Sequence, residues 1–161
     1  MKRGNQGFTL LALLIAVALM GAGLAAFGEL ASHARQREKE QELLFIGGQY
    51  RDAIGAFYER TPGVAKRYPR ELEELLADKR FAHKPSYLRR LYPDPMNGSK
   101  TWGLVKAPDG GIMGVYSLSE EKPIKSGAFG PKDLALAGAL RYCDWQFFYK
   151  PTSPTGLRAG R

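Results

Sequence analysis

An uncharged run of 21 residues, from Phe8 to Gly28, constrains this chain more than any other feature. As an α-helix the run would be about 32 Å long, enough to cross the roughly 30 Å hydrocarbon core of a bilayer. Lys2 and Arg3 precede it, and positive charges stay on the cytoplasmic side of a membrane helix. We therefore expect a single-pass transmembrane helix over residues 8–28, with the N-terminus in the cytoplasm.

A secretory signal peptide is the alternative, because it too combines a basic start with an apolar core. Two observations favour a retained helix. The run is longer than a usual signal core, and no Ala-x-Ala-type cleavage site follows it before the charges begin. Residues 22–26 come nearest to such a site, so a secreted product stays open.

A basic leader, a Gly-Phe-Thr-Leu junction at residues 7–10 and a full-length apolar run follow one another in that order. In this arrangement the chain resembles the type IV prepilins, which include the pseudopilins of type II secretion. The resemblance implies that a prepilin peptidase cuts after Gly7 and methylates the new N-terminal Phe8. It also implies an assembly segment made of Phe8, Thr9, Leu10, Leu11 and Ala12.

Ala12 departs from the family pattern, since most members carry Glu at the fifth residue after the cut. In the family this Glu is thought to pair with the N-terminal ammonium of a neighbouring subunit, which hides two charges in an environment of low dielectric constant. A subunit with Ala12 is poorly suited to repeated internal stacking and fits a minor or tip-proximal place. A relaxed paralogue that lost the Glu is the equal alternative.

Beyond Gly28 the helical pattern continues, and residues 29–60 read as an amphipathic half of the same helix. Apolar residues at three- and four-residue spacing mark one face, which we expect the head to pack on: Leu43, Ile46, Tyr50, Ile54 and Phe57.

Three further features of this half-helix carry predictions. Residues 35–42 form a highly charged collar that we expect to be solvated. Gly47-Gly48 indicates either close approach of another segment or a bend, and we favour close approach. Thr61-Pro62-Gly63 predicts the end of the helix.

Residues 61–150 predict a small α+β head with a three- or four-stranded antiparallel sheet, followed by a disordered tail over 151–161. Strand-like runs cover Thr101–Lys106, Ile112–Leu118 and Asp144–Lys150, and Asp109-Gly110 predicts a hairpin between the first two. A short helix is predicted within residues 67–76, and a helical turn at 133–137.

Three pieces of the head resemble the major pseudopilin of type II secretion. They are Tyr68-Pro69 before a Leu-bearing helix, the loop Pro93–Gly98 with Met96 where Trp is usual, and the strand Gly114–Leu118 with its Ser-Leu end. In that pseudopilin a calcium-binding loop follows. Here Glu120 and Glu121 offer some oxygen ligands, but two lysines intrude and no Asp-rich run follows. We expect no cofactor, with calcium as the one candidate.

Composition narrows the function further. The net charge is +8, but the basic residues are dispersed and form no nucleic-acid motif, so we expect no nucleic-acid partner.

The single cysteine, Cys143, excludes an intrachain disulfide, and its apolar neighbours predict a buried thiol. His33 and His83 lie too far apart to suggest zinc. No catalytic motif is present, so we expect no enzyme.

The sequence therefore predicts a structural subunit of a type II secretion pseudopilus that assists protein export. Its expected partners are other pseudopilins or pilins, prepilin peptidase and the inner-membrane assembly platform. We expect it in the inner membrane with a periplasmic head, and in the pseudopilus after assembly. Two alternatives stay open: a minor type IV pilin for adhesion, motility or DNA uptake, and a membrane-anchored periplasmic binding protein that never joins a fibre.

Overall fold

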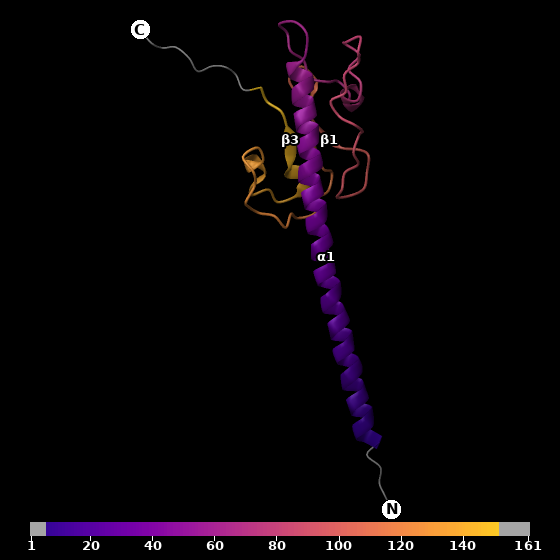
Figure 1. The fold of residues 1–161 in the computed structure, drawn as a ribbon. Coiled ribbons are helices and arrows are strands. Elements are labelled where there is room, and N and C mark those ends of the chain that lie inside the picture. Colours follow the sequence, from indigo (N-terminus) through magenta and orange to yellow (C-terminus); the bar gives the residue numbers. More distant parts are fainter. Residues whose placement is uncertain (1–5, 152–161) are drawn as a thin grey trace, which may run out of the picture. The chain divides into compact units, whose positions relative to one another are not determined.

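The computed structural model describes residues 6–151, except for the side chains of residues 6, 7, 9 and 21–31. The predicted tail beyond residue 151 and most of the predicted leader lie outside the described residues. The chain divides into two units, Met1–Glu38 and Lys39–Arg161, and each is described by itself. Helix α1, Gln6–Glu59, runs through the first unit and into the second (Figure 1). Its end at Glu59 confirms the stop predicted from Thr61-Pro62-Gly63.

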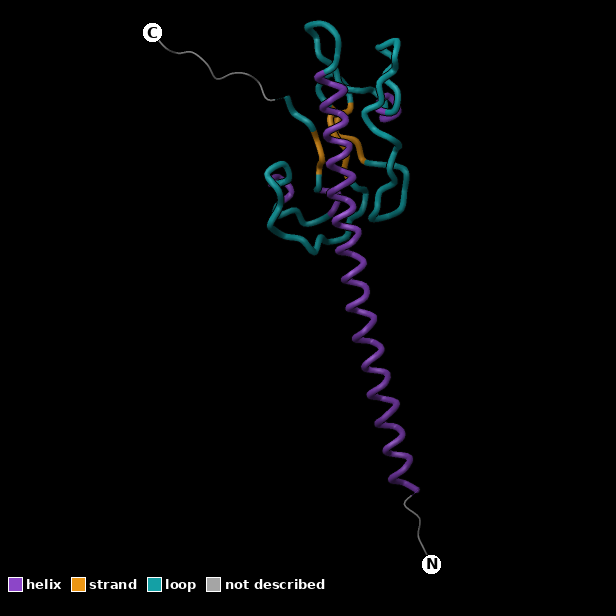
Figure 2. The backbone as a smooth tube through the Cα atoms, in the orientation of Figure 1, coloured by secondary structure: helices purple, strands orange, loops and turns teal. Residues whose placement is uncertain are grey.

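The second unit contains a three-stranded antiparallel sheet in the order β1-β2-β3. The strands are β1 (Gly103–Lys106), β2 (Ile112–Tyr116) and β3 (Gln146–Phe148), and they lie beside the C-terminal part of α1 (Figure 2). All three fall inside the predicted runs but are shorter at their ends. The α+β prediction with a three-stranded antiparallel sheet is confirmed.

The core of this unit forms between α1 and one face of the sheet. The helix contributes a stripe whose side chains are at most 3% exposed: Leu43, Ile46, Tyr50, Ile54 and Phe57. Fully buried Val115 and Phe147 face it from paired positions on β2 and β3. Apolar burial between helix and sheet therefore holds the unit together, and no disulfide contributes because Cys143 is the only cysteine.

Gly47 explains how close the sheet comes to α1. A Cβ atom at this position would lie 2.4 Å from the ring of Phe147, whereas at Gly48 the nearest atom would be 3.7 Å away, on Arg51. The predicted close approach is confirmed at Gly47, and α1 runs through both glycines without a break.

The C-terminal end of α1 is closed by side chains from the segments that follow it. The carbonyl of Phe57 accepts hydrogen bonds from Thr61 (3.2 Å) and from Nη2 of Arg80 (2.9 Å). Lys66 donates to the carbonyl of Glu59 at 2.6 Å. Two of the three donors are cations, which suits the negative end of the helix dipole.

The predicted helix within residues 67–76 is wrong in extent, because only a single 3₁₀ turn, η1 (Leu72–Leu75), forms. The carbonyl of Leu75 accepts the amides of Tyr87 (2.8 Å) and Leu88 (3.1 Å), so tertiary bonds replace the next helical bonds. The helical turn predicted at 133–137 is confirmed as the 3₁₀ helix η2 (Leu134–Leu136). A further 3₁₀ helix, η3 (Tyr142–Asp144), precedes β3.

Two predictions about exposure need correction. Glu40, expected in the solvated collar, is only 3% exposed. Cys143, expected to be buried, is half-buried, because η3 turns the buried side chain of Tyr142 inward and leaves its neighbour near the surface.

Candidate functional site

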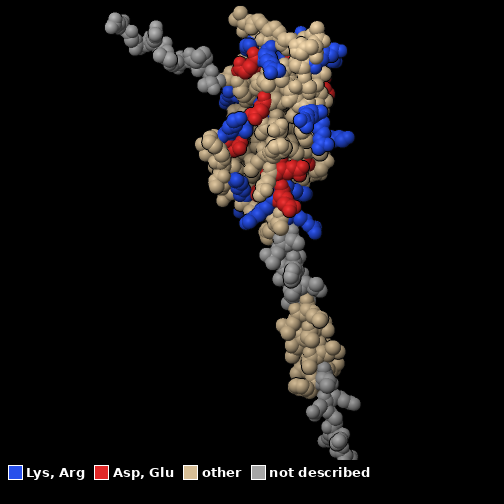
Figure 3. Space-filling model, viewed as in Figure 1, with Lys and Arg blue, Asp and Glu red and all other residues tan. Residues whose placement is uncertain are grey.

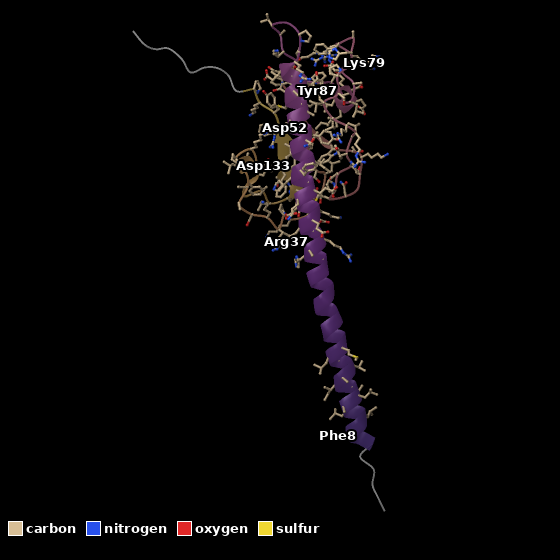
Figure 4. The ribbon with its side chains drawn as sticks, in the orientation of Figure 1. Phe8, Arg37, Asp52, Lys79, Tyr87 and Asp133 are labelled. Atoms are coloured by element: carbon tan, nitrogen blue, oxygen red, sulfur yellow. The ribbon has the colours of Figure 1, made fainter. Side chains whose placement is uncertain are left out.

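The N-terminal part of α1 presents apolar side chains in all directions. Phe8 is 72% exposed, and eight further large apolar residues are between 53% and 72% exposed: Leu10, Leu11, Leu13, Leu14, Ile15, Val17, Leu19 and Met20. Successive residues of an α-helix point about 100° apart, so this set surrounds the axis. Figures 3 and 4 show this stretch without charged atoms and with side chains spread around the helix. A helix that is apolar on every side is normally buried in lipid or among other helices.

The predicted processing and assembly residues lie at the start of this stretch. Gly7 falls within the helical range of α1, Phe8 follows it, and Leu10, Leu11 and Ala12 are exposed. The side chain of Thr9 lies outside the described residues. In the part of the chain that the structure describes, no helix has an apolar stretch long enough to cross a membrane. The predicted membrane-spanning range 8–28 includes residues 9 and 21–28, whose side chains lie outside that part.

Comparison with known families concerns this same segment. The family model described as the prokaryotic N-terminal methylation motif matches residues 2–28. The N-terminus therefore carries a methylation motif that is type IV prepilin-like. The match includes the predicted cleavage junction, Gly7–Phe8, and the whole apolar run of this prepilin-like N-terminus. No curated protein and no solved structure is significantly similar to the chain.

In the second unit, two of the head motifs meet at a buried hydrogen bond. The side chain of Asp94, in the Pro-Asp-Pro loop, is fully buried. It accepts the Ser117 hydroxyl at 2.7 Å and the Met96 amide at 2.9 Å. Met96 itself is only 6% exposed and belongs to the core. The loop is thereby fastened to the residue that follows β2.

Glu40 fastens the connection between β2 and β3. Its Oε1 atom accepts the backbone amides of Ile124 (2.7 Å) and Lys125 (3.0 Å) and the hydroxyl of Tyr142 (3.0 Å). Sequence reasoning missed this role because Glu40 sits in a charged run. The available signal was its position three residues before Leu43, which continues the buried stripe toward the N-terminus.

A third buried carboxylate, Asp78, organises the segment after η1. Arg80 pairs with it at 2.6 Å and also donates to Thr61, while Tyr87 donates to it at 2.9 Å. Burial raises the pKa of Asp78, but the hydrogen bonds and charge of Arg80, with the hydroxyl of Tyr87, outweigh it and lower the pKa overall. Burial and the bond to Asp78 raise the pKa of Tyr87.

Two other tyrosines also hold their protons more tightly than usual. Burial raises the pKa of Tyr50 to about 12, and its hydroxyl contacts the backbone of Tyr92. The hydroxyl of Tyr149 donates to Glu59, and this bond raises the pKa of Tyr149 to about 12. Both groups act as neutral hydrogen-bond donors between helix and head.

A charged hollow of about 550 Å³ lies beside the C-terminal end of α1, where its lining residue Arg80 bonds the carbonyl of Phe57. Its lining holds four cations and two carboxylates: Arg67, Arg70, Lys79, Arg80, Glu71 and Glu74. Arg80 is committed to Asp78, and Arg67 pairs with Glu74 at 3.2 Å. Within the described residues, the side chains of Arg70 and Lys79 are exposed and make no hydrogen bond or ion pair. The hollow therefore presents two unpaired positive charges.

Across the described part of the chain, no three His, Cys, Asp or Glu residues are grouped so that they could hold a metal ion. Glu120 and Glu121, the candidate calcium ligands, are both exposed and lie in the connection between β2 and β3.

Proposed function

We propose that this protein is a structural subunit of a type II secretion pseudopilus, in a minor or tip-proximal place. The observation that carries the proposal is the methylation motif at residues 2–28, continuous with a helix whose residues 8–20 expose apolar side chains on every side. Such a segment needs lipid before assembly and the helices of other subunits afterwards, and close apolar packing supplies cohesion in both settings.

In this proposal the chain is made as a precursor. Prepilin peptidase cuts between Gly7 and Phe8 and methylates Phe8, which leaves a mature chain that starts at the first residue of the apolar run. Residues 8–28 anchor the subunit in the inner membrane with the N-terminus in the cytoplasm, because the two leader cations precede the run. The head is periplasmic, and the assembly platform moves the subunit into the fibre.

The minor placement rests on Ala12. A methyl group at this position cannot neutralise the N-terminal ammonium of a neighbouring subunit, so a fibre built only from this chain would bury unpaired charges. If the subunit is used only once or a few times, at or near the tip, the fibre contains few such unpaired charges.

Intact mass of the protein extracted from membranes of its native host tests the processing step. A mass that starts at Phe8 and includes one methyl group is expected. A chain that retains residues 1–7, or one that starts near Ala26, contradicts the proposal. Gly7→Val should abolish processing, whereas Gly4→Val, in the same leader, should leave it unchanged.

The kind of fibre is tested separately. Deletion of the gene should reduce export of folded proteins, and neighbouring genes should encode a secretion ATPase and an outer-membrane secretin. A retraction ATPase in that neighbourhood, with normal export and lost twitching, would assign the subunit to a type IV pilus instead.

A further inference from the structure

We propose that copies of this chain contact one another head to tail: the charged hollow of one copy receives the α1 surface around Glu42 of the next. The inference rests on the proposed function and deepens it, because it names the surfaces through which heads meet. Both surfaces belong to the second unit, and each has charges that make no ion pair with any described residue.

The receiving surface is the hollow lined by Arg67, Arg70, Glu71, Glu74, Lys79 and Arg80. Both carboxylate oxygens of Glu74 are already used, by the Arg67 guanidinium and by the backbone amide of Arg70. Arg70 and Lys79 remain as unpaired cations at the rim. A carboxylate that enters the hollow therefore meets cations that no described residue neutralises.

The hollow suits a protein segment better than a nucleic acid. Glu71 is exposed and lines the same hollow without a side-chain partner among the described residues. A nucleic-acid backbone carries a negative charge at every step, and part of it would be held against this carboxylate. A protein surface can place one acid on the cations and neutral groups beside Glu71.

The donating surface is the exposed side of α1 around Glu42. Glu42 is exposed and makes no hydrogen bond or ion pair within the described part of the chain. Phe45, three residues on and therefore on the same side of the helix, is 63% exposed. An unpaired acid beside an exposed aromatic ring combines charge with apolar area, as the centres of protein interfaces do.

The two surfaces lie at opposite ends of the globular unit. Two residues that line the hollow contact Phe57. Arg80 donates a hydrogen bond to the carbonyl of Phe57 at 2.9 Å, and the Arg67 guanidinium lies 5.4 Å from the centroid of its ring. Along α1, Glu42 precedes Phe57 by about 22 Å. Figure 4 shows Lys79 and Tyr87 near the C-terminal end of α1, with Asp52 further back along the helix. Glu42 therefore cannot reach the hollow of its own copy.

A contact between two different surfaces of identical chains leaves one free surface at each end, so it can join the few copies that the proposed place at or near the tip allows. A second copy of this chain is therefore the occupant that the charges and their separation favour. We expect added salt to weaken the contact, because both partners are exposed charges.

Cross-linking in the full-length protein tests this contact in a host that carries the assembly machinery. In a Cys143→Ser background, one copy carries Gln41→Cys, beside Glu42, and another carries Glu71→Cys, in the hollow. A bismaleimide should join them. Lys106→Cys, at an exposed position of β1 and outside the hollow, replaces Glu71→Cys as the matched control and should give no product.

Charge reversal decides whether the two surfaces recognise each other. Arg70→Glu with Lys79→Glu in the receiving copy should lower the cross-linked yield about tenfold, and Glu42→Lys in the donating copy should restore it. An unchanged yield after reversal, failure of the rescue, or a product whose mass is not that of two copies overturns the proposal.

A Leu13→Cys pair separates this failure from failure of the proposed function. Products at Leu13 in processed protein, with none between residues 41 and 71, would keep the fibre and reject the docking. Unprocessed protein without products at either place would reject both.

Discussion

The hydroxyl of Ser117 donates a 2.7 Å hydrogen bond to Oδ2 of Asp94, across 23 residues of sequence and in full burial. Asp94 has no cationic partner among the described residues, so hydroxyl and amide donors alone solvate its carboxylate. A buried charge in such a position makes its few donors important for stability.

Removal of the Ser117 hydroxyl should therefore destabilise the head. We expect Ser117→Ala to lower the free energy of unfolding by about 2 kcal/mol, because it removes a hydrogen bond to a buried charged acceptor. Ser126→Ala, at an exposed serine, is the control and should have little effect. Urea denaturation of the detergent-solubilised chain measures both. Equal stability of the two variants would show that the bond contributes nothing.

Glu40 should hold the β2–β3 connection in place. Glu40→Ala removes one acceptor that two backbone amides and the Tyr142 hydroxyl share, and we expect the free energy of unfolding to fall by about 3 kcal/mol. Hydrogen exchange should speed up specifically at the amides of Ile124 and Lys125. Glu42→Ala, at an exposed residue two positions on, should leave exchange at these amides as it is. If both variants behave alike, the connection is held by something else.

Substitution by Ala at the two neighbouring glycines of α1, Gly47 and Gly48, should change the stability of the protein in opposite directions. Gly47→Ala would press a methyl group into the ring of Phe147, and we expect a loss of about 1–3 kcal/mol. Gly48→Ala meets only the end of the Arg51 side chain at 3.7 Å and should stabilise the helix by up to about 1 kcal/mol. Thermal unfolding of the two variants beside the wild type gives the signs. A stable Gly47→Ala protein would mean that the sheet can move away from the helix.

Asp78 should make the stability of the head depend on acid pH. Its pKa is lowered in the folded state, so its contribution is complete above the ordinary carboxyl value of about 3.9 and is lost as the pH falls from there toward the folded pKa. Asp78→Asn should lower stability at neutral pH and flatten this part of the profile. Urea midpoints between pH 2 and pH 7, roughly the range of carboxyl titration, measure the slope. A wild-type slope retained in Asp78→Asn would assign the acid sensitivity to other carboxylates.

Ala12→Glu should raise incorporation of the subunit into fibres. The added carboxylate supplies the partner that the N-terminal ammonium of a neighbour lacks, in an environment where an unpaired charge is costly. The subunit content of sheared fibres, relative to the amount in the membrane, measures incorporation. Ala16→Glu, one helical turn further on, is the control and should not help. Unchanged incorporation with Ala12→Glu would remove the argument for a minor place.

Strongly periodic segments were predictable without the structure. The stripe from Leu43 to Phe57 repeats with the period of a helix, and burial then requires an apolar partner on that side. The aromatic run around Phe147 and the Asp109-Gly110 turn predicted strands because side-chain shape and turn chemistry act over a few residues. The Gly47-Gly48 pair also predicted a close contact, but the sequence did not say that it forms at Gly47 or with which residue.

What the sequence by itself determined are the features that depend on neighbours along the chain: the methylation motif at residues 2–28, the helix, the hairpin and the absence of a disulfide. Only the tertiary structure decided that Glu40 is buried, that η1 stops after one turn, and that Arg70 and Lys79 line one hollow. The physical reason is that a charge is buried, or a helix ended, by donors and acceptors far away in sequence. Glu40 meets Tyr142 across 102 residues, and no local pattern encodes that meeting.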